Sequence, residues 1–215
     1  MAKKVFLSAG HGGKDPGAVG NNLKEKDLNL NILLACKEEL ERHDVKVICS
    51  RTKDENDPVA DEVKEANKSG ADIAVSFHAN AGGGDGSETY YYTSSKDGKK
   101  LAELCEKHTK AIGQNSRGVK NGNNLYFVNS TSMVAVLCEC AFVDNKTDKQ
   151  IIDTKAEQEK FGVAYAKAIL EYLGIKYKEP VKKIYKVQVG SFSSKANAQA
   201  LQKELKADGY DAIIV

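Results

Sequence analysis

Short apolar runs alternate with helix-like stretches along the first 173 residues, and this alternation constrains the fold more than any other feature of the chain. The runs Val5–Ala9 and Ala71–Phe77 have the length and composition of buried strands. Between them, Asp27–His43 carries apolar residues close to helical spacing. Strands that alternate with helices indicate an α/β fold whose sheet is covered on both faces.

The same reading predicts further elements before Gly174. Additional strands are expected at Val45–Cys49, Glu88–Tyr92, Leu125–Val128 and Ala135–Glu139. Additional helices are expected from Asp57 to about Lys68, at Lys96–Gly113 and at Ala156–Leu173. Asp57 followed by Pro58 has the pattern of an N-cap and a first helical residue.

The pattern changes after Gly174. Residues 175–184 carry charge, a proline and no periodicity, which is typical of a linker. A strand at Tyr185–Val189, a helix at Lys195–Asp208 and a strand at Asp211–Val215 then form a small C-terminal βαβ half-module. The predicted organisation is a main domain over 1–174, a linker and this short segment.

Charge and hydropathy exclude several classes of partner. The 32 basic and 30 acidic side chains leave a formal net charge of +2, which gives no basis for nucleic acid binding. No stretch reaches the roughly 18 apolar residues that span a bilayer, so we expect no membrane insertion. The N-terminus has no signal-peptide pattern, so we expect a chain made in the cytoplasm. The odd count of five cysteines favours reduced, buried thiols.

Three polar residues stand where strands end or helices begin, which is where open α/β sheets place their sites. His11 follows the first strand, Glu25 lies at the start of the first long helix, and His78 ends the third strand. Two imidazoles and one carboxylate are the ligand set of a catalytic zinc with its fourth position open. The sequence therefore makes His11, Glu25 and His78 candidate Zn²⁺ ligands.

Other interpretations of these residues stay open at this point. A single histidine at a strand end is more often structural than a ligand, and Glu25 could only complement a helix dipole. The segment SAGHGG could cradle a phosphate, although it lacks the dinucleotide fingerprint and the Lys-Ser/Thr of a nucleotide-triphosphate loop. The remaining histidines, His43 and His108, are expected to face solvent.

Glu139 is flanked by apolar residues in VAVLCECAF. A charged side chain in a buried strand is costly unless it is paired or functional, so Glu139 is a candidate general base that faces the metal site. Asn80 follows His78 by two residues and could either contact substrate or cap a turn.

Residues Lys4 to Leu173 resemble the zinc-dependent N-acetylmuramoyl-L-alanine amidases of the type-3 family, which includes autolysins and phage endolysins. The matching segments, in the order of the family, are SAGHGGKDPGAVG, LKEKDLNL, SRT, ADIAVSFHANA, SRGVK and VLCECAFVDN. The resemblance implies a twisted, mostly parallel sheet, zinc bound by His11, Glu25 and His78, and Glu139 as the catalytic carboxylate. It implies hydrolysis of the amide bond between the lactyl group of N-acetylmuramic acid and L-alanine in peptidoglycan.

Two features depart from the family. Many members carry an arginine where this chain has Glu62 and Val63, and some carry a regulatory helix that nothing in this sequence resembles. Two alternative functions remain: a zinc peptidase that cuts within the stem peptide, and a non-catalytic wall-binding protein. Without a signal peptide, we expect action on the cell wall after release, by phage lysis or mother-cell lysis.

The C-terminal segment resembles the first half of a SPOR domain, a peptidoglycan-binding module. The residues that carry this likeness are Tyr185, Gln188, Gly190, Phe192, Ala196 and Gly209. One strand-helix-strand unit leaves an apolar face uncovered, so we predict either wall binding by residues 185–215 or a homodimer through them.

Overall fold

The computed structural model describes residues 2–180 and 187–214, and the chain divides into two compact units. The first unit comprises Met1–Lys178 and the second Glu179–Val215. Each unit is described by itself. Ile175 and Tyr177 pack against the core of the first unit, which therefore continues past Gly174 into the stretch expected as a linker.

A six-stranded sheet of order β4-β1-β5-β8-β6-β7 forms the centre of the first unit. Its strands are β1 (Lys4–Ala9), β4 (Lys46–Cys49), β5 (Ile73–Asn80), β6 (Ser87–Tyr91), β7 (Ser116–Asn121) and β8 (Val134–Phe142). Every neighbouring pair is parallel except β6 with β8. The expected mostly parallel α/β sheet is confirmed. Because β6 and β7 run opposite to the other strands, their first residues lie at the edge where β1, β5 and β8 end.

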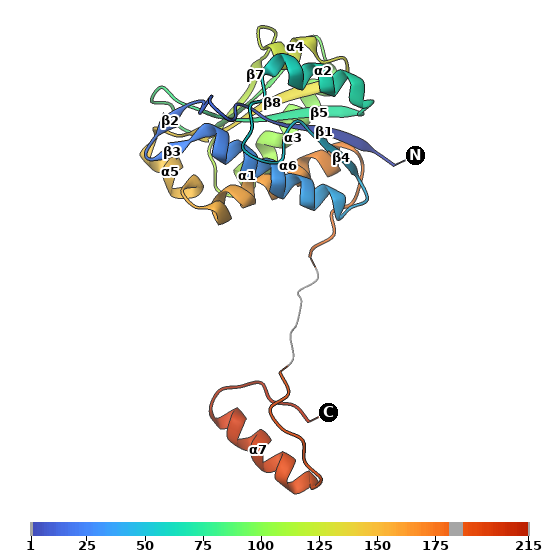
Figure 1. The fold of residues 1–215 in the computed structure, drawn as a ribbon, viewed down its shortest axis with the longest axis vertical. Coiled ribbons are helices and arrows are strands. Elements are labelled where there is room, and N and C mark those ends of the chain that lie inside the picture. Colours follow the sequence, from blue (N-terminus) through green and yellow to red (C-terminus); the bar gives the residue numbers. More distant parts are fainter. Residues whose placement is uncertain (1, 181–186, 215) are drawn as a thin grey trace. The chain divides into compact units, whose positions relative to one another are not determined.

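Helices cover both faces of this sheet (Figure 1). One face packs against α1 (Glu25–Glu41), α3 (Lys96–Ala111) and α6 (Lys155–Tyr172). The other face carries α2 (Val59–Ser69) and α4 (Tyr126–Ser130), which lie over β1 and β8. In the described part of the chain, the main helix packed against β6 and β7 is α3, on the first face. A short helix α5 (Lys146–Ile152) and a hairpin of β2 (Val19–Gly20) and β3 (Leu23–Lys24) complete the unit.

Alternate residues of the central strands divide between two apolar clusters. In β5, Val75 and Phe77 face the large cluster against α1, α3 and α6, whereas Ala74 faces the small cluster under α2 and α4. The next residues on the small-cluster side of β5 are Ser76 and His78, so this face becomes polar toward the carboxyl ends of the strands. All five cysteines are unpaired, as expected, and four of them are buried.

Helix ends follow local capping chemistry. Thr154 and Glu157 form a capping box at the start of α6, and Ser95 accepts the backbone N–H of Gly98 at the start of α3. The expected cap at Asp57 is wrong. Pro58 occupies the N-cap of α2 in an extended conformation, and the helix begins at Val59. A proline at this position carries no N–H that would need a partner.

The strand expected at Leu125–Val128 is also wrong, because these residues begin the one-turn helix α4. Phe127 and Val128 are both buried although they are adjacent, while Tyr126 is half exposed. A helix can bury two successive residues on one side, whereas a strand with one covered face cannot. An apolar run of four residues does not distinguish the two by periodicity.

The second unit contains helix α7 (Lys195–Ala207), which confirms the expected helix to within a residue. The flanking strands are not found among the described residues. Val187–Val189 and Asp211–Ile214 have no strand pairing, and Tyr185, Lys186 and Val215 lie outside the described residues. Instead, the amide of Gln202 on α7 donates to the carbonyl of Ala212. A two-stranded pair is marginal without further strands, which accounts for the difference.

His43 and His108 are not the solvent-facing residues that the helical pattern suggested. His43 is buried in the turn after α1, where its Nδ1 contacts the carbonyl of Glu39 at 2.8 Å and its Nε2 accepts the N–H of Lys178. His108 lies 2.7 Å from the carboxylate of Glu171. In the part of the chain that the structure describes, every helix is too short or too polar to cross a membrane.

Candidate active site

The end of β1 delivers His11 into a tight loop. His11 adopts a φ of +66°, a region that is costly for a non-glycine residue. Gly10 precedes it, and a Cβ atom at Gly10 would stand 2.1 Å from Cε1 of His78. The backbone of β1 can therefore approach the His78 ring only because this position is glycine.

The three candidate ligands from β1, α1 and β5 meet at one point. Nε2 of His11 lies 3.2 Å from Oε2 of Glu25, and Nδ1 of His78 lies 2.9 Å from Oε1 of the same carboxylate. The two imidazole rings are 5.2 Å apart and nearly perpendicular. One candidate donor atom from each residue lies within 4.8 Å of the other two.

This arrangement fits a metal ion of the kind that the donor chemistry selects. Two nitrogen donors and one carboxylate oxygen suit Zn²⁺, which binds them at about 2.0–2.2 Å in tetrahedral geometry. Tetrahedral ligands at that distance are about 3.4 Å from one another. The separations of 2.9 and 3.2 Å between the nitrogens and the carboxylate oxygens are close to this value, so an ion can enter with small side-chain shifts.

Charge in the cluster is balanced by protons when no metal is bound. The hydrogen bond to Glu25 raises the pKa of His11 to about 9, against the opposing effect of burial. Burial alone would lower the pKa of His78, but Glu25 and the charge of Glu139 outweigh it and the net direction is upward. Burial likewise would raise the pKa of Glu25, yet its bonds to the two histidines lower it. A bound cation would replace these protons, because a ligating imidazole must give up the proton on its donor nitrogen.

Further hydrogen bonds fix the side chains of the candidate ligands. Asp15 lies 2.8 Å from Nδ1 of His11, the carboxylate–histidine pairing that orients metal-bound imidazoles. The backbone N–H groups of Ala18 and Ala79 donate to Glu25, and the amide of Asn29 donates to the carbonyl of Gly10. Neither Asp15 nor Asn29 was expected from the sequence. For Asp15, the one indication is its position four residues after His11.

Arg51 links the segment around His11 to the start of α1 by hydrogen bonds. Its buried guanidinium donates to the carbonyls of Ala9, Gly10 and Lys26, which belong to the loop of His11 and the first turn of α1. Burial lowers the pKa of Arg51. The SRT segment that contains Arg51 thus anchors to each other two segments that carry candidate ligands.

Glu139 of β8 stands beside His78, because the two residues are register partners in the β5–β8 ladder. Its Oε2 atom is buried and has no hydrogen-bond partner among the described residues. Burial raises the pKa of Glu139 from its ordinary 4.5 to about 7. An orphaned carboxylate oxygen beside a set of metal ligands is what a proton-accepting group needs before its reactant arrives.

Asn80 lies two residues after His78 on β5 and contacts protein: its amide donates to Oε1 of Glu88 at 3.2 Å, and its Oδ1 accepts the N–H of Ala81. Glu88 of β6 is the register partner of Glu139 and is 4% exposed. His78, Glu139 and Glu88 therefore form a continuous polar row across three neighbouring strands.

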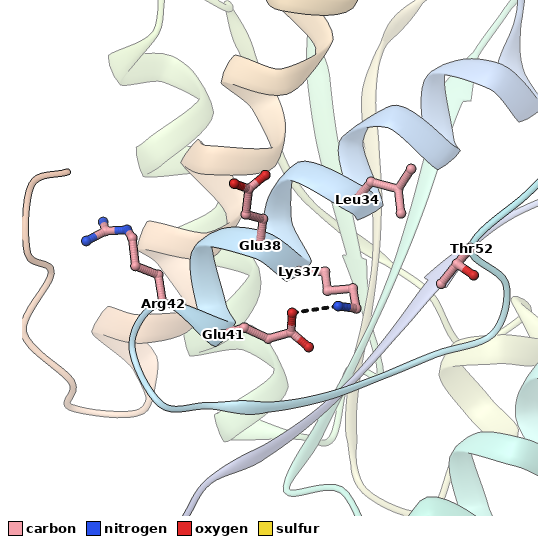
Figure 2. A pocket seen from close by; sticks show the side chains of 6 residues that line it. All are labelled: Leu34, Lys37, Glu38, Glu41, Arg42 and Thr52. Carbon is pink, nitrogen blue, oxygen red and sulfur yellow. Dashed lines mark hydrogen bonds and ion pairs between the residues drawn. The ribbon is translucent and has the colours of Figure 1, made fainter. Parts of the chain in front are cut away.

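Figure 2 shows a surface hollow on α1. Its lining residues belong to the second half of α1 and the loop after β4: Leu34, Lys37, Glu38, Glu41, Arg42 and Thr52. Lys37 forms an ion pair with Glu41 across it. At 1.5 Å per residue, Lys37 is about 18 Å along the helix axis from Glu25, so the hollow does not belong to the ligand cluster.

Comparison with known proteins gives two family matches. Residues 5–171 match the N-acetylmuramoyl-L-alanine amidase family, and residues 164–215 match the SPOR domain. The first match covers His11, Glu25, His78 and Glu139.

Individual relatives agree with the family matches. A sporulation-specific N-acetylmuramoyl-L-alanine amidase of Bacillus subtilis (strain 168) is 34% identical over 220 residues, covering 99% of this chain and 84% of that protein. An endolysin of Bacillus phage SPP1 is 39% identical over 187 residues, covering 83% of this chain and 69% of the endolysin. The crystal structure of an N-acetylmuramoyl-L-alanine amidase from Clostridium difficile 630 superposes with a TM-score of 0.76 at 34% identity, covering 80% of this chain and 97% of the other.

Proposed function

Because the chain belongs to the N-acetylmuramoyl-L-alanine amidase family, we propose that His11, Glu25 and His78 hold its catalytic Zn²⁺ and that Glu139 is its general base. The chain is a peptidoglycan amidase. It hydrolyses the bond between the lactyl group of N-acetylmuramic acid and L-alanine of the stem peptide, in remodelling or lysis of the cell wall. The observation that carries the residue assignment is the convergence of two imidazoles on one buried carboxylate, with the unpartnered oxygen of Glu139 alongside.

The chain's own residues divide the work of this hydrolysis. Zn²⁺, when bound, supplies a Lewis acid that polarises a carbonyl group and makes a water molecule more acidic. Glu139 accepts the proton that water loses as it attacks the lactyl carbonyl. When the carbon–nitrogen bond breaks, Glu139 returns that proton to the nitrogen of L-alanine, which leaves as a free amine. Asp15 keeps the imidazole of His11 in one orientation through the cycle.

The ligand assignment is tested by metal content and activity together. In His78→Ala, we expect loss of bound zinc and of wall-lytic activity with an unchanged far-UV circular dichroism spectrum, because the sheet is held by the apolar clusters. His108→Ala is the matched control, since His108 bonds Glu171 on the helical face away from the site. Full activity in His78→Ala would contradict the assignment.

A zinc peptidase that cuts within the stem peptide remains the alternative function for the same ligand set. Product analysis separates the two reactions. An amidase releases peptides that begin with L-alanine and leaves free lactyl groups on the glycan, whereas a peptidase leaves L-alanine attached to muramic acid.

For the C-terminal unit we propose wall binding and homodimerisation through residues 185–215. The support is the SPOR match together with six exposed apolar side chains in the described part of this unit: Val187, Val189, Phe192, Tyr210, Ile213 and Ile214. Light scattering on the full chain and on a form that ends at Lys178 decides the second point. We expect a dimer that becomes a monomer on truncation, and a monomeric full chain would exclude it. Pelleting of the two forms with purified cell walls tests wall binding.

We further propose that the enzyme reaches the wall after release of the chain, by phage or mother-cell lysis. Two relatives support this proposal, one named as a phage endolysin and one as a sporulation-specific amidase. Fractionation of the producing cells before and after lysis is the test. Secreted enzyme in the medium of intact cells would contradict it.

A further inference from the structure

A guanidinium group continues the polar row beyond Glu88. Arg117 of β7 donates its Nε–H to Oε2 of Glu88 at 2.8 Å, and the ammonium of Lys120 lies 4.0 Å from the same oxygen. The β6–β7 ladder shifts register between Ser87 and Thr89, opposite Arg117. Such irregularities re-aim side chains, and here both cations point to the same carboxylate.

Glu88 fixes the position of the Arg117 guanidinium, because Glu88 is itself buried and hydrogen-bonded. Its side chain is 6% exposed, and its other oxygen accepts from the hydroxyl of Tyr90 at 2.8 Å and from Asn80. The Arg117 side chain is 40% exposed and also lies over the ring of Phe142, with Cζ 5.1 Å from the ring centre. Only the Nε edge of the guanidinium has a hydrogen-bond partner among the described residues. Its two Nη groups therefore remain available to a ligand.

The guanidinium of Arg117 lies within reach of a peptide whose scissile bond is at Glu139. Neighbouring strands are about 4.8 Å apart, so the backbone of Arg117 on β7 lies about 10 Å from that of Glu139 on β8. An extended peptide covers that distance in about three residues. Among the described residues, the main helix packed against β6 and β7 is α3, on the opposite face, so a peptide can lie across this one.

We propose that Arg117, fixed by Glu88 and assisted by Lys120, binds a carboxylate of the stem peptide two or three residues beyond the scissile bond. This inference rests on the proposed function, since it needs the scissile amide at Glu139. A planar guanidinium with two free Nη groups binds a carboxylate in bidentate fashion, so the subsite suits a stem peptide that carries an acidic residue at either position. The subsite makes the enzyme selective for stem peptides whose carboxyl groups are free.

The test compares three soluble muramoyl-peptide substrates with the zinc-loaded full chain. One substrate carries free carboxylates, one a carboxamide at the second stem residue, and one a carboxamide at the third. We expect one of the two amidated substrates to have a kcat/KM about tenfold to hundredfold lower than the acidic substrate, the range for one charge-assisted hydrogen-bonded contact. The residue whose amidation matters identifies the carboxylate bound.

Variants assign this preference to Arg117. In Arg117→Gln the ratio of kcat/KM between acidic and amidated substrates should fall toward one, and Arg117→Lys should keep part of it, because it retains charge without the fork. Lys99→Gln is the control of equal charge, since α3 begins at the opposite end of the sheet, and it should leave activity and ratio unchanged. A wild-type enzyme without preference, or an Arg117→Gln variant that keeps it, would overturn the inference. Failure to release L-alanine-terminated peptide from any substrate would instead overturn the proposed function.

Discussion

Replacing Glu139 by glutamine should abolish turnover and at the same time stabilise the metal-free protein above neutral pH. The carboxyl of Glu139 has its pKa raised from 4.5 to about 7 by burial, and its Oε2 atom has no partner among the described residues. The folded state therefore favours the protonated form. Its stabilising effect is fully present below about pH 4.5 and is lost as pH rises through about 7.

The size of the effect follows from the shift. A difference of about 2.5 pKa units corresponds to roughly 3 kcal/mol between ionised and neutral forms. Glu139→Gln removes this destabilisation at pH 8, but its buried amide without a partner costs about 1 kcal/mol. The net gain in unfolding free energy is therefore about 2 kcal/mol. At pH 4.5, where the wild-type carboxyl is neutral in the folded state and only half ionised in the unfolded chain, the gain should be absent.

Urea unfolding of chelator-treated protein at pH 4.5 and pH 8 measures this difference. Glu38→Gln is the matched control, because Glu38 is exposed on α1 and its substitution should change stability equally at both pH values. A Glu139→Gln protein that is no more stable than wild type at pH 8 would refute the argument from burial. With zinc restored, the variant should keep the metal and lose about 100- to 10,000-fold in kcat. Loss of zinc instead would show that Glu139 is a ligand.

Three further variants probe the site and the scaffold. Asp15→Asn should lower zinc affinity about 10- to 100-fold while the protein stays folded, which competition with a chelator measures; unchanged affinity would remove Asp15 from the metal site. Gly10→Ala should displace the His78 ring, because the new Cβ would stand 2.1 Å from Cε1, and should abolish metal binding; a fully active variant would contradict the packing. Thr154→Ala should cost about 1 kcal/mol in urea unfolding by removing the capping box of α6, with no change in kcat/KM.

The central strands could be predicted from sequence because they are covered on both faces. β1, β5 and β8 are near-continuous apolar runs, and their ends locate the candidate ligands. The edge strand β7 was missed because one of its faces is open. Its sequence SRGVKN is mostly polar and partly exposed, so it shows no apolar alternation.

The supporting residues of the site were harder to find for a different reason. Asp15, Asn29 and Glu88 act through contacts with residues distant in sequence or through loop geometry, and each is a common polar residue in an unremarkable local pattern. Asn80 illustrates the limit. Its position after His78 left substrate contact and turn capping equally open. In the structure its Oδ1 accepts the backbone N–H of Ala81, and its amide donates to the carboxylate of Glu88 on β6, two strands away. Cross-strand register decides such partners, and local sequence does not encode it.

Glu88 and Glu139 also show why one sheet can carry two carboxylates in different states. They are direct register partners on β6 and β8, so ionisation of one opposes ionisation of the other. Burial acts on both, but the bonds from Arg117 and Tyr90 outweigh it at Glu88 and lower its pKa. Glu139 has no such donor among the described residues, and its pKa rises to about 7. The fixed negative charge of Glu88 thus helps to keep Glu139 able to hold a proton. A group that takes a proton and later returns it needs a pKa near the working pH. Arg117 contributes to this indirectly, because its Nε–H bond keeps Glu88 ionised beside Glu139.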